Sequence, residues 1–291
     1  MKILVTGAKG MLGQDLCPIL EDEGYEVLET DSKTLDITDC ALVQKTVSEV
    51  KPDIIIHTAA YTNVDKAESD YIAAELLNCT AVKNLAAVMK EADGTLIHIS
   101  TDYVFGGGER TTPYTEDLPT EPTSVYGLTK LHGEQGIKEI DCKYIILRTA
   151  WLYSEFGKNF VKTVMALIAS RPELKVVFDQ VGTPTYAGDL AAVICTIIEK
   201  RLYDANNGIY HYSNEGVCSW FDFALKIAAN AGNTKCKVQP CLSHEFPSPV
   251  RRPAYSVLDK AKFKESFEIN IPYWSESLQV CMNKILANNK K

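Results

Sequence analysis

A glycine-spaced turn near the amino terminus most constrains the fold. The apolar run Ile3–Val5 is followed at once by Gly7, Gly10 and Gly13, and then by leucines at helical spacing. Glycines at these positions allow a tight turn and let the backbone approach a diphosphate, whose charge is stabilised by the helix N-terminus. The pattern predicts a strand, a glycine turn and a helix that together bind a dinucleotide, with a plain turn as the alternative.

Further apolar segments predict an α/β fold with a Rossmann-type, doubly wound parallel sheet. Ile54–His57 is almost continuously apolar, as expected for a strand that helices cover on both faces. Other strands are predicted at Glu26–Thr30, Leu96–Ile99 and Tyr144–Arg148, and helices at about 40–50 and 73–89.

Beyond residue 150 the strands and helices alternate less regularly. We therefore expect a dinucleotide-binding Rossmann domain over 1–150, with later elements returning around 174–200. The returning part includes a predicted strand at Lys175–Phe178 and a helix at about 187–200. A smaller C-terminal substrate-binding lobe is expected to make up most of 151–291.

The composition favours a globular cytoplasmic protein. The 291 residues, 46% of them apolar, can bury a sizeable core, and a net charge of −8 argues against nucleic-acid or anionic-membrane binding. The nine cysteines are scattered without metal-binding spacing, which favours reduced thiols in the cytosol. No apolar run approaches the ~20 residues that a transmembrane helix needs, so no membrane partner is expected.

Tyr126 and Lys130, four residues apart, are candidate acid-base groups. On a helix they would lie on one face, about 5–6 Å apart. An adjacent ammonium favours the phenolate, so we expect Lys130 to lower the pKa of Tyr126 toward neutrality. Thr101, after the predicted strand Leu96–Ile99, would lie at the carboxyl edge of the sheet, where ligands bind. The alternatives are a solvated helix face and a polar turn.

A candidate adenosine-binding acid ends the second strand. Asp31 follows Gly13 by 18 residues, a separation that suits a hydrogen bond to an adenosine ribose hydroxyl. Lys9 and Lys33 could instead accept a 2′-phosphate, so we expect use of both NADH and NADPH. An ordinary turn residue is the alternative for Asp31.

Two irregular segments could border a ligand. The loop over 106–122 is rich in Gly, Pro, Thr and Glu and is predicted to be a mobile rim or lid. The proline-rich segment Glu245–Tyr255 carries Arg251 and Arg252, which could clasp a diphosphate. A solvent-exposed basic loop is the alternative for the second segment.

Three motifs in this order resemble the extended short-chain dehydrogenase/reductase superfamily: Gly7-x-x-Gly10-x-x-Gly13, Ser100-Thr-Asp-Tyr-Val-Phe105 and Tyr126-x-x-x-Lys130. Within it the chain is most similar to a branch that reduces the 4-keto group of a dTDP-linked deoxysugar. More specific strings carry that similarity, at Ala59–Glu68, Arg148–Tyr153 and Asp179–Thr185, with a weaker one at Arg252–Ser256. The resemblance is strongest over residues 1 to about 190.

The resemblance implies an NAD(P)-binding domain, NADPH or NADH as cofactor and a small nucleotide sugar as substrate. Tyr126 would donate the proton, Lys130 would bind the nicotinamide ribose and tune Tyr126, and Thr101 would hydrogen-bond the substrate oxygen. The other residues expected to bind the cofactor are Gly7, Gly10, Met11, Leu12, Gly13, Asp31, Asp36, Ile37, Ala59, Ala60 and Tyr61. The residues expected to bind the sugar nucleotide are Thr101, Asp102, Trp151 and Arg252.

The resemblance leaves other readings open. A nucleotide-sugar epimerase or dehydratase shares the fold and the Tyr/Lys pair, and a non-catalytic regulatory subunit could share the fold alone. A 4,6-dehydratase typically has Glu where this chain has Tyr103, which favours a reductase. Some members hold magnesium at a dimer contact through glutamates, but the corresponding region here has Asp15 and Asp189. No structural metal is predicted, and the expected state is a monomer or homodimer.

Overall fold

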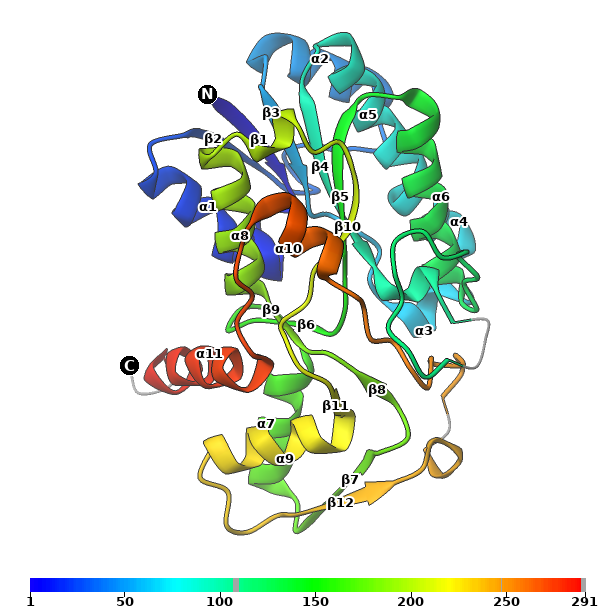
Figure 1. Cartoon of the computed structure of the whole chain (residues 1–291), viewed down its shortest axis with the longest axis vertical. Helices are drawn as coiled ribbons and strands as arrows, with labels where there is room; N and C mark the ends of the chain where they lie inside the picture. Colours follow the sequence, from blue (N-terminus) through cyan, green and yellow to red (C-terminus); the bar gives the residue numbers. More distant parts are fainter. Residues whose placement is uncertain (107–109, 247, 289–291) are drawn as a thin grey trace.

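A six-stranded sheet lies at the centre of the computed structural model, which describes residues 1–106, 110–246 and 248–288 (Figure 1). The strand order is β10-β5-β4-β3-β1-β2, and every pair of neighbours is parallel. The strands are β1 (Lys2–Thr6), β2 (Glu26–Thr30), β3 (Ile54–His57), β4 (Thr95–Thr101), β5 (Lys143–Thr149) and β10 (Gly208–His211). The predicted α/β fold with a parallel sheet is confirmed.

Helices cover both faces of this sheet, as Figure 1 shows. Successive residues of β1 enter two different cores: Ile3 and Val5 pack with α1 and α8, whereas Leu4 packs with α2 and α5. This alternation is what a strand buried on both faces requires. The helices around the sheet are α1 (Met11–Asp22), α2 (Cys40–Val50), α3 (Val64–Ala67), α4 (Tyr71–Glu75), α5 (Ala81–Glu91), α6 (Val125–Ile140), α8 (Ala187–Glu199) and α10 (Ala261–Phe267).

The remaining elements form a smaller lobe below the sheet in Figure 1. They enclose a separate apolar core in which Phe223 is fully buried. Within the lobe β7 pairs with β12 in parallel and β8 pairs with β11 antiparallel, while β6 pairs with β9. The elements are β6 (Leu152–Tyr153), α7 (Phe160–Ser170), β7 (Glu173–Val177), β8 (Val181–Gly182), β9 (Thr185–Tyr186), β11 (Cys218–Ser219), α9 (Trp220–Asn230), β12 (Lys237–Cys241) and α11 (Trp274–Asn288).

The part of the chain that returns to the sheet differs from the expectation. Helix α8 packs against α1, but the predicted strand Lys175–Phe178 corresponds to β7, which pairs with β12 outside the main sheet. The sixth strand of the main sheet is β10, which pairs with β5. This strand, Gly-Ile-Tyr-His, has only two adjacent apolar residues to mark it in the sequence, so its pairing with β5 assigns it.

The predicted helix over 73–89 runs from Tyr71 to Glu91 and contains a π-helical segment, Leu76–Thr80. Within this segment the buried Asn78 amide oxygen accepts from the backbone N of Tyr61 at 2.8 Å, and its nitrogen donates to the Thr129 hydroxyl at 3.0 Å. The whole helix has 21 residues and a mean hydropathy of 1.3, so by length and composition it could cross a membrane, contrary to expectation. Half of its most apolar window is buried in the fold, as in a core helix.

A buried ion pair anchors α6 to the sheet. The Arg148 guanidinium on β5 binds Glu134 on α6 through two contacts, Nε to Oε1 at 2.9 Å and Nη2 to Oε2 at 2.7 Å. The two side chains are only 3% and 1% exposed. Ser100 on β4 donates to the same carboxylate, and the Arg148 guanidinium also lies over the Phe105 ring. The pair therefore fixes the helix that carries Tyr126 and Lys130.

We expect Glu134→Gln to lower the free energy of unfolding by about 3–5 kcal/mol, because it leaves the Arg148 charge buried without its partner. The control is Glu139→Gln, on the same helix as Glu134, which removes an exposed ion pair with Lys83 of α5 at 4.0 Å. This control should lower the free energy of unfolding by only about 0–1 kcal/mol. Urea unfolding followed by circular dichroism measures both. Equal losses in the two variants would contradict the anchoring role.

Candidate active site

The glycine turn brings the start of α1 close to the end of β3. Gly7 has a φ of +73°, and a Cβ there would lie 2.7 Å from the backbone N of Ala59. A Cβ on Gly13 would lie 2.5 Å from the Cα of Ala8, so Gly13 serves the packing of α1 on the turn. Gly10 precedes α1, and no side chain caps the helix there. The amino end of α1 is thus suited to an anion.

A cleft of about 530 Å³ opens at this turn. Nine of the predicted cofactor residues line it: Gly7, Gly10, Met11, Leu12, Asp31, Asp36, Ile37, Ala59 and Ala60. Gly13, Tyr61, Tyr126 and Lys130 do not line it. Gly157 and Lys158, from the segment before α7, also line the cleft and were not predicted, because only the tertiary fold brings that segment back to the turn.

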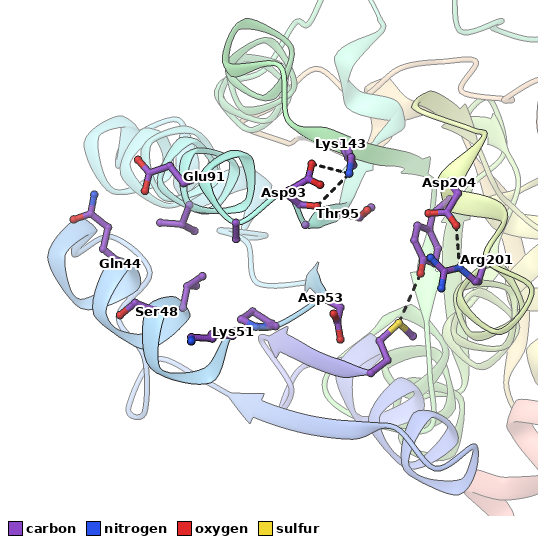
Figure 2. A pocket seen from close by; sticks show the side chains of 17 residues that line it. Gln44, Ser48, Lys51, Asp53, Glu91, Asp93, Thr95, Lys143, Arg201 and Asp204 are labelled. Atoms are coloured by element: carbon purple, nitrogen blue, oxygen red, sulfur yellow. Dashed lines mark hydrogen bonds and ion pairs between the residues drawn. The ribbon is translucent and has the colours of Figure 1, made fainter.

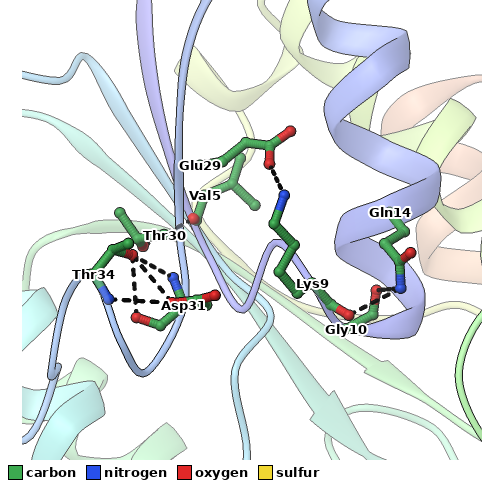
Figure 3. A network of polar contacts seen from close by, with 8 residues as sticks. All are labelled: Val5, Lys9, Gly10, Gln14, Glu29, Thr30, Asp31 and Thr34. Carbon is green, nitrogen blue, oxygen red and sulfur yellow. Dashed lines mark hydrogen bonds and ion pairs between the residues drawn. The ribbon is translucent and has the colours of Figure 1, made fainter.

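Asp31 and Lys9, which line this cleft, are already engaged within the protein (Figure 3). The Asp31 Oδ1 atom accepts from the backbone N of Lys33 at 2.9 Å. It also accepts from the backbone N of Thr34 at 3.1 Å. Led by the Lys33 bond, these interactions hold the pKa of Asp31 below its ordinary value. Lys9 Nζ lies 2.7 Å from the Glu29 carboxylate. A ligand phosphate would have to compete with Glu29 for Lys9.

A second cleft, of about 910 Å³, contains none of the predicted site residues (Figure 2). It lies at the amino edge of the sheet, where Asp53 precedes β3 and Thr95 begins β4. Lys143 and Asp93 on its wall are paired at 2.7 Å. Open α/β sheets bind ligands at the opposite edge, so the smaller cleft at the carboxyl edge is the candidate site.

Close packing places Tyr126 beside the end of β4. The Ser124 hydroxyl caps α6 by accepting from the backbone N of Gly127 at 3.1 Å. A Cβ on Gly127 would lie 2.1 Å from the carbonyl oxygen of Tyr103, so the glycine lets the turn after β4 lie directly on the helix. The rings of Tyr103 and Tyr126 consequently meet edge to face, 5.5 Å apart. This contact places Tyr126 close to Thr101, the last residue of β4.

The predicted lowering of the Tyr126 pKa is wrong for this structure. Desolvation raises the pKa of the Tyr126 phenol well above its ordinary value, and the Thr101 hydroxyl only partly opposes that shift. Lys130 does not offset it, because its Nζ donates to the Ile99 carbonyl oxygen at 2.7 Å and lies 3.2 Å from His98 Nε2. Helical spacing placed the two residues on one helix face but did not specify what Lys130 contacts. Tyr126 is protonated at neutral pH, as a proton donor must be, but the raised pKa also makes its phenol a weaker acid.

Burial acts in the opposite direction on Lys130. Desolvation lowers the pKa of its ammonium to about 8, and the negative charge of Glu134 only partly opposes this shift. A buried ammonium with a lowered pKa near a cleft is a common feature of functional sites.

Asp102 and Trp151 lie near each other through Ser256 and Gly182. Asp102 is buried, its Oδ2 has no hydrogen-bond partner within the described part of the chain, and desolvation raises its pKa to about 7. The Ser256 hydroxyl opposes that shift, and a Cβ on Gly182 would meet both Ser256 and Trp151 at 2.7 Å. Trp151 adopts a φ of +49° and stacks on Trp220 with centroids 3.6 Å apart. Ser256 was missed as a site residue, although the weak string at Arg252–Ser256 pointed to it.

Arg252 and Tyr61 each contact a carboxylate. Arg252 pairs with Asp65 at 3.4 Å and lowers the pKa of Tyr103, whereas desolvation raises that pKa overall, to about 12. The Tyr61 hydroxyl donates to Asp70 at 3.0 Å and its backbone is held by Asn78. Residues 107–109 of the predicted rim loop and Pro247 of the proline-rich segment lie outside the described residues.

The region compared with a magnesium site holds hydrogen-bonded carboxylates. Asp15 accepts from the Ser154 hydroxyl at 2.7 Å, and Asp189 accepts from Asn214 and Ser277. In the ranges 1–106, 110–246 and 248–288, no three side chains of the metal-binding types are grouped to hold an ion. The absence of a structural metal stays a prediction.

Comparison with known proteins identifies the family. The model of the family described as RmlD substrate binding domain matches residues 1–287. A dTDP-4-dehydrorhamnose reductase of Aggregatibacter actinomycetemcomitans is 40% identical, over 96% of this chain and 97% of that protein.

Solved structures agree with that match. The structure of a dTDP-4-dehydrorhamnose reductase from Clostridium acetobutylicum has a TM-score of 0.93 and 44% identity, and covers 98% of this chain and 100% of its own. The enzyme of the same name from Bacillus anthracis, in complex with NADP, has a TM-score of 0.91 and 40% identity over 97% of this chain and 99% of its own. The chain therefore belongs to the RmlD substrate binding domain family, and the predicted reductase family, oxidoreductase class and Rossmann-type fold are confirmed.

Proposed function

We propose that this chain reduces the C4 keto group of dTDP-4-dehydro-L-rhamnose to give dTDP-L-rhamnose, a precursor of rhamnose-containing polysaccharides, with NADPH or NADH as hydride donor. The supporting observation is that Thr101 ends β4 at the carboxyl edge of the sheet, where the glycine turn also opens its cleft, and that Tyr126 packs on Tyr103 just after it, with ring centroids 5.5 Å apart. Relatives of about 40% identity carry the corresponding name, and one of them is in complex with NADP.

The cleft residues suit a nicotinamide dinucleotide. The uncapped amino end of α1 after Gly10 would hold the diphosphate, and Asp31 would face the adenosine ribose. The small side chains of Ala59 and Ala60 would let the nicotinamide half lie close to the end of β3. A bound dinucleotide would supply the hydride.

The protein's own task in this reaction is to protonate the carbonyl oxygen as the carbon is reduced. Tyr126, whose phenol is neutral at pH 7, would donate that proton, and the Thr101 hydroxyl would hydrogen-bond the same oxygen. Lys130 would bind the nicotinamide ribose as an ammonium, which is its dominant form below pH 8. Two neutral hydroxyl donors and one cation therefore suffice.

Tyr103 favours reduction over dehydration. A 4,6-dehydratase needs a base for the C5 proton, and this chain has a tyrosine where dehydratases typically have glutamate. Desolvation raises the pKa of Tyr103 to about 12, so its phenolate is scarce at neutral pH.

The finer arrangement of partners is also part of the proposal. The nucleotide sugar would bind between the carboxyl edge of the domain over 1–150 and the lobe over 151–291, against Asp102, Trp151 and Arg252. We propose a cytoplasmic monomer or homodimer without nucleic-acid or membrane partners, a reading that the net charge of −8 supports.

With dTDP-4-dehydro-L-rhamnose and NADPH we expect dTDP-L-rhamnose, with one NADPH oxidised per product. Tyr126→Phe should lower kcat at least ~10²-fold, because it removes only the proton donor, and should change NADPH affinity less than about threefold. The control is Tyr144→Phe, near the amino end of β5 and so at the edge of the sheet opposite the candidate site. Product chromatography and absorbance of NADPH measure both. A dehydrated product from dTDP-glucose and NAD would favour the dehydratase, and a Tyr126→Phe enzyme above about a tenth of wild-type kcat would mean another acid.

The wild-type chain should use NADH and NADPH with less than ~10³-fold difference in kcat/KM. We expect Glu29→Gln to raise the NADPH-to-NADH ratio of kcat/KM by a few-fold, because it releases Lys9 for a 2′-phosphate. The control is Glu26→Gln, on the same strand as Glu29, which removes an exposed ion pair with Lys2 of β1. An unchanged ratio after Glu29→Gln would exclude Lys9 from cofactor selection.

We expect kcat/KM to fall as the pH rises through about 8, because the Lys130 ammonium has a pKa lowered to about that value and is lost above it. Lys130→Arg should weaken activity and remove this basic limb, since arginine stays charged. Asp102→Asn separates any effect of that carboxyl, whose pKa is raised to about 7. If kcat/KM still falls above about pH 8 in Lys130→Arg, the fall comes from another group.

A further inference from the structure

The ammonium of Lys130 is held by neutral groups. Lys130 is only 2% exposed, and its Nζ contacts the carbonyl oxygen of Ile99 and the Nε2 atom of His98. Glu134, one turn further along α6, is instead paired with Arg148. The position of this cation therefore depends on a backbone carbonyl and one imidazole.

The contact fixes the chemical form of His98. An ammonium has three N–H donors and no acceptor, so Nε2 must offer its lone pair and the ring proton must sit on Nδ1. His98 is fully buried, and this burial, together with the charge of Lys130, holds its pKa well below the ordinary value. As long as Lys130 is charged, His98 is thus its acceptor.

Burial of the His98 imidazole lowers stability, because one of its ring nitrogens lacks a hydrogen-bond partner among the residues that the structure describes. Within the described residues its Nδ1 has no hydrogen-bond partner, and the same is true of Nε2 on the neighbouring His57. A buried N–H without an acceptor lowers stability, and an apolar residue of similar size would avoid that loss. The imidazole at position 98 therefore points to a task for its other nitrogen.

His57 fixes the ring plane of His98. The strand register places Thr6, His57 and His98 side by side on β1, β3 and β4. The Thr6 hydroxyl lies 2.6 Å from His57 Nδ1, and the His57 ring stacks on the His98 ring with centroids 5.1 Å apart and planes 20° apart. Motion of the His98 ring is restricted from the β3 side.

We infer that His98 is a positioning residue for the reduction: its Nε2 and the Ile99 carbonyl hold two N–H donors of Lys130 and leave the third for the ribose of the dinucleotide. The identity of that ligand rests on the proposed function. The contact between His98 and Lys130 does not depend on the proposed function.

Removal of the acceptor should make the ammonium easier to deprotonate. The titratable and charged groups near Lys130 are Glu134 on its own helix, His98 on β4 and, behind it, His57 on β3, and Tyr126 lies one turn earlier on α6. An aliphatic residue at 98 offers no lone pair, whereas the amide oxygen of glutamine does.

The test follows the ¹³Cε shift of Lys130 by NMR against pH in the full chain without ligands, assigned with Lys130→Arg. In His98→Leu we expect the midpoint to fall about one unit, a tenfold loss of proton affinity. The NADPH dissociation constant at pH 8 should rise about fivefold or more. In His98→Gln the proton affinity of Lys130 and the NADPH dissociation constant should both stay within about threefold of their wild-type values. The control is His132→Leu, at another position of α6, which removes an imidazole paired with Glu75 of α4. It should leave the Lys130 midpoint and the NADPH dissociation constant unchanged.

An unchanged midpoint in His98→Leu would overturn the inference. Equal shifts in His98→Leu and His98→Gln would also overturn it, because the effect would then come from ring packing. If His98→Leu does not fold, His98→Met serves as the acceptor-free variant, with the same expected shift. Since the titration needs no substrate, a chain inactive on dTDP-4-dehydro-L-rhamnose would refute the proposed function and still leave the His98 result readable.

Discussion

The bidentate contact between Arg148 and Glu134 is the interaction on which the geometry of the site depends. It joins β5 to α6 in a region where neither side chain reaches water, and Ser100 on β4 completes the carboxylate's partners. Such a pair contributes little net stability compared with apolar packing, but it permits only one placement of the helix. Because Tyr126 and Lys130 lie earlier on the same helix, their positions relative to the sheet edge follow from this contact.

Two close backbone approaches refine that placement. Gly127 lets the turn after β4 touch α6, and Gly133 lets the π-helical segment approach the same helix, since a Cβ there would lie 2.3 Å from the Asn78 carbonyl oxygen. π-Helical segments are often found at functional sites, and this one turns Asn78 toward Tyr61 and Thr129. The dense packing that positions Tyr126 is also what desolvates its phenol, so position and pKa have one cause.

The sequence predicted the parts of this structure that local pattern determines. The strand, turn and helix around Gly7 and the parallel sheet follow from apolar periodicity and glycine spacing. It could not predict what contacts Lys130, because helical spacing defines a face and says nothing of burial or of His98 on another strand. The place of β7 outside the main sheet and that of Ser256 beside Asp102 likewise depend on pairings between distant segments.

Burial has opposite consequences for the two groups of the Tyr/Lys pair. It raises the pKa of Tyr126 and lowers that of Lys130, so both shifts favour the neutral form. A neutral tyrosine is ready to donate a proton, whereas a lysine with a pKa of about 8 is only marginally held as a cation above neutrality. Any ligand that prefers the ammonium must therefore raise the pKa of Lys130 as it binds, and by linkage its affinity must weaken as the pH rises through the pKa of the free protein. Desolvation, opposed in part by the charge of Glu134, consequently sets both the charge of Lys130 and the pH range over which it can bind such a ligand.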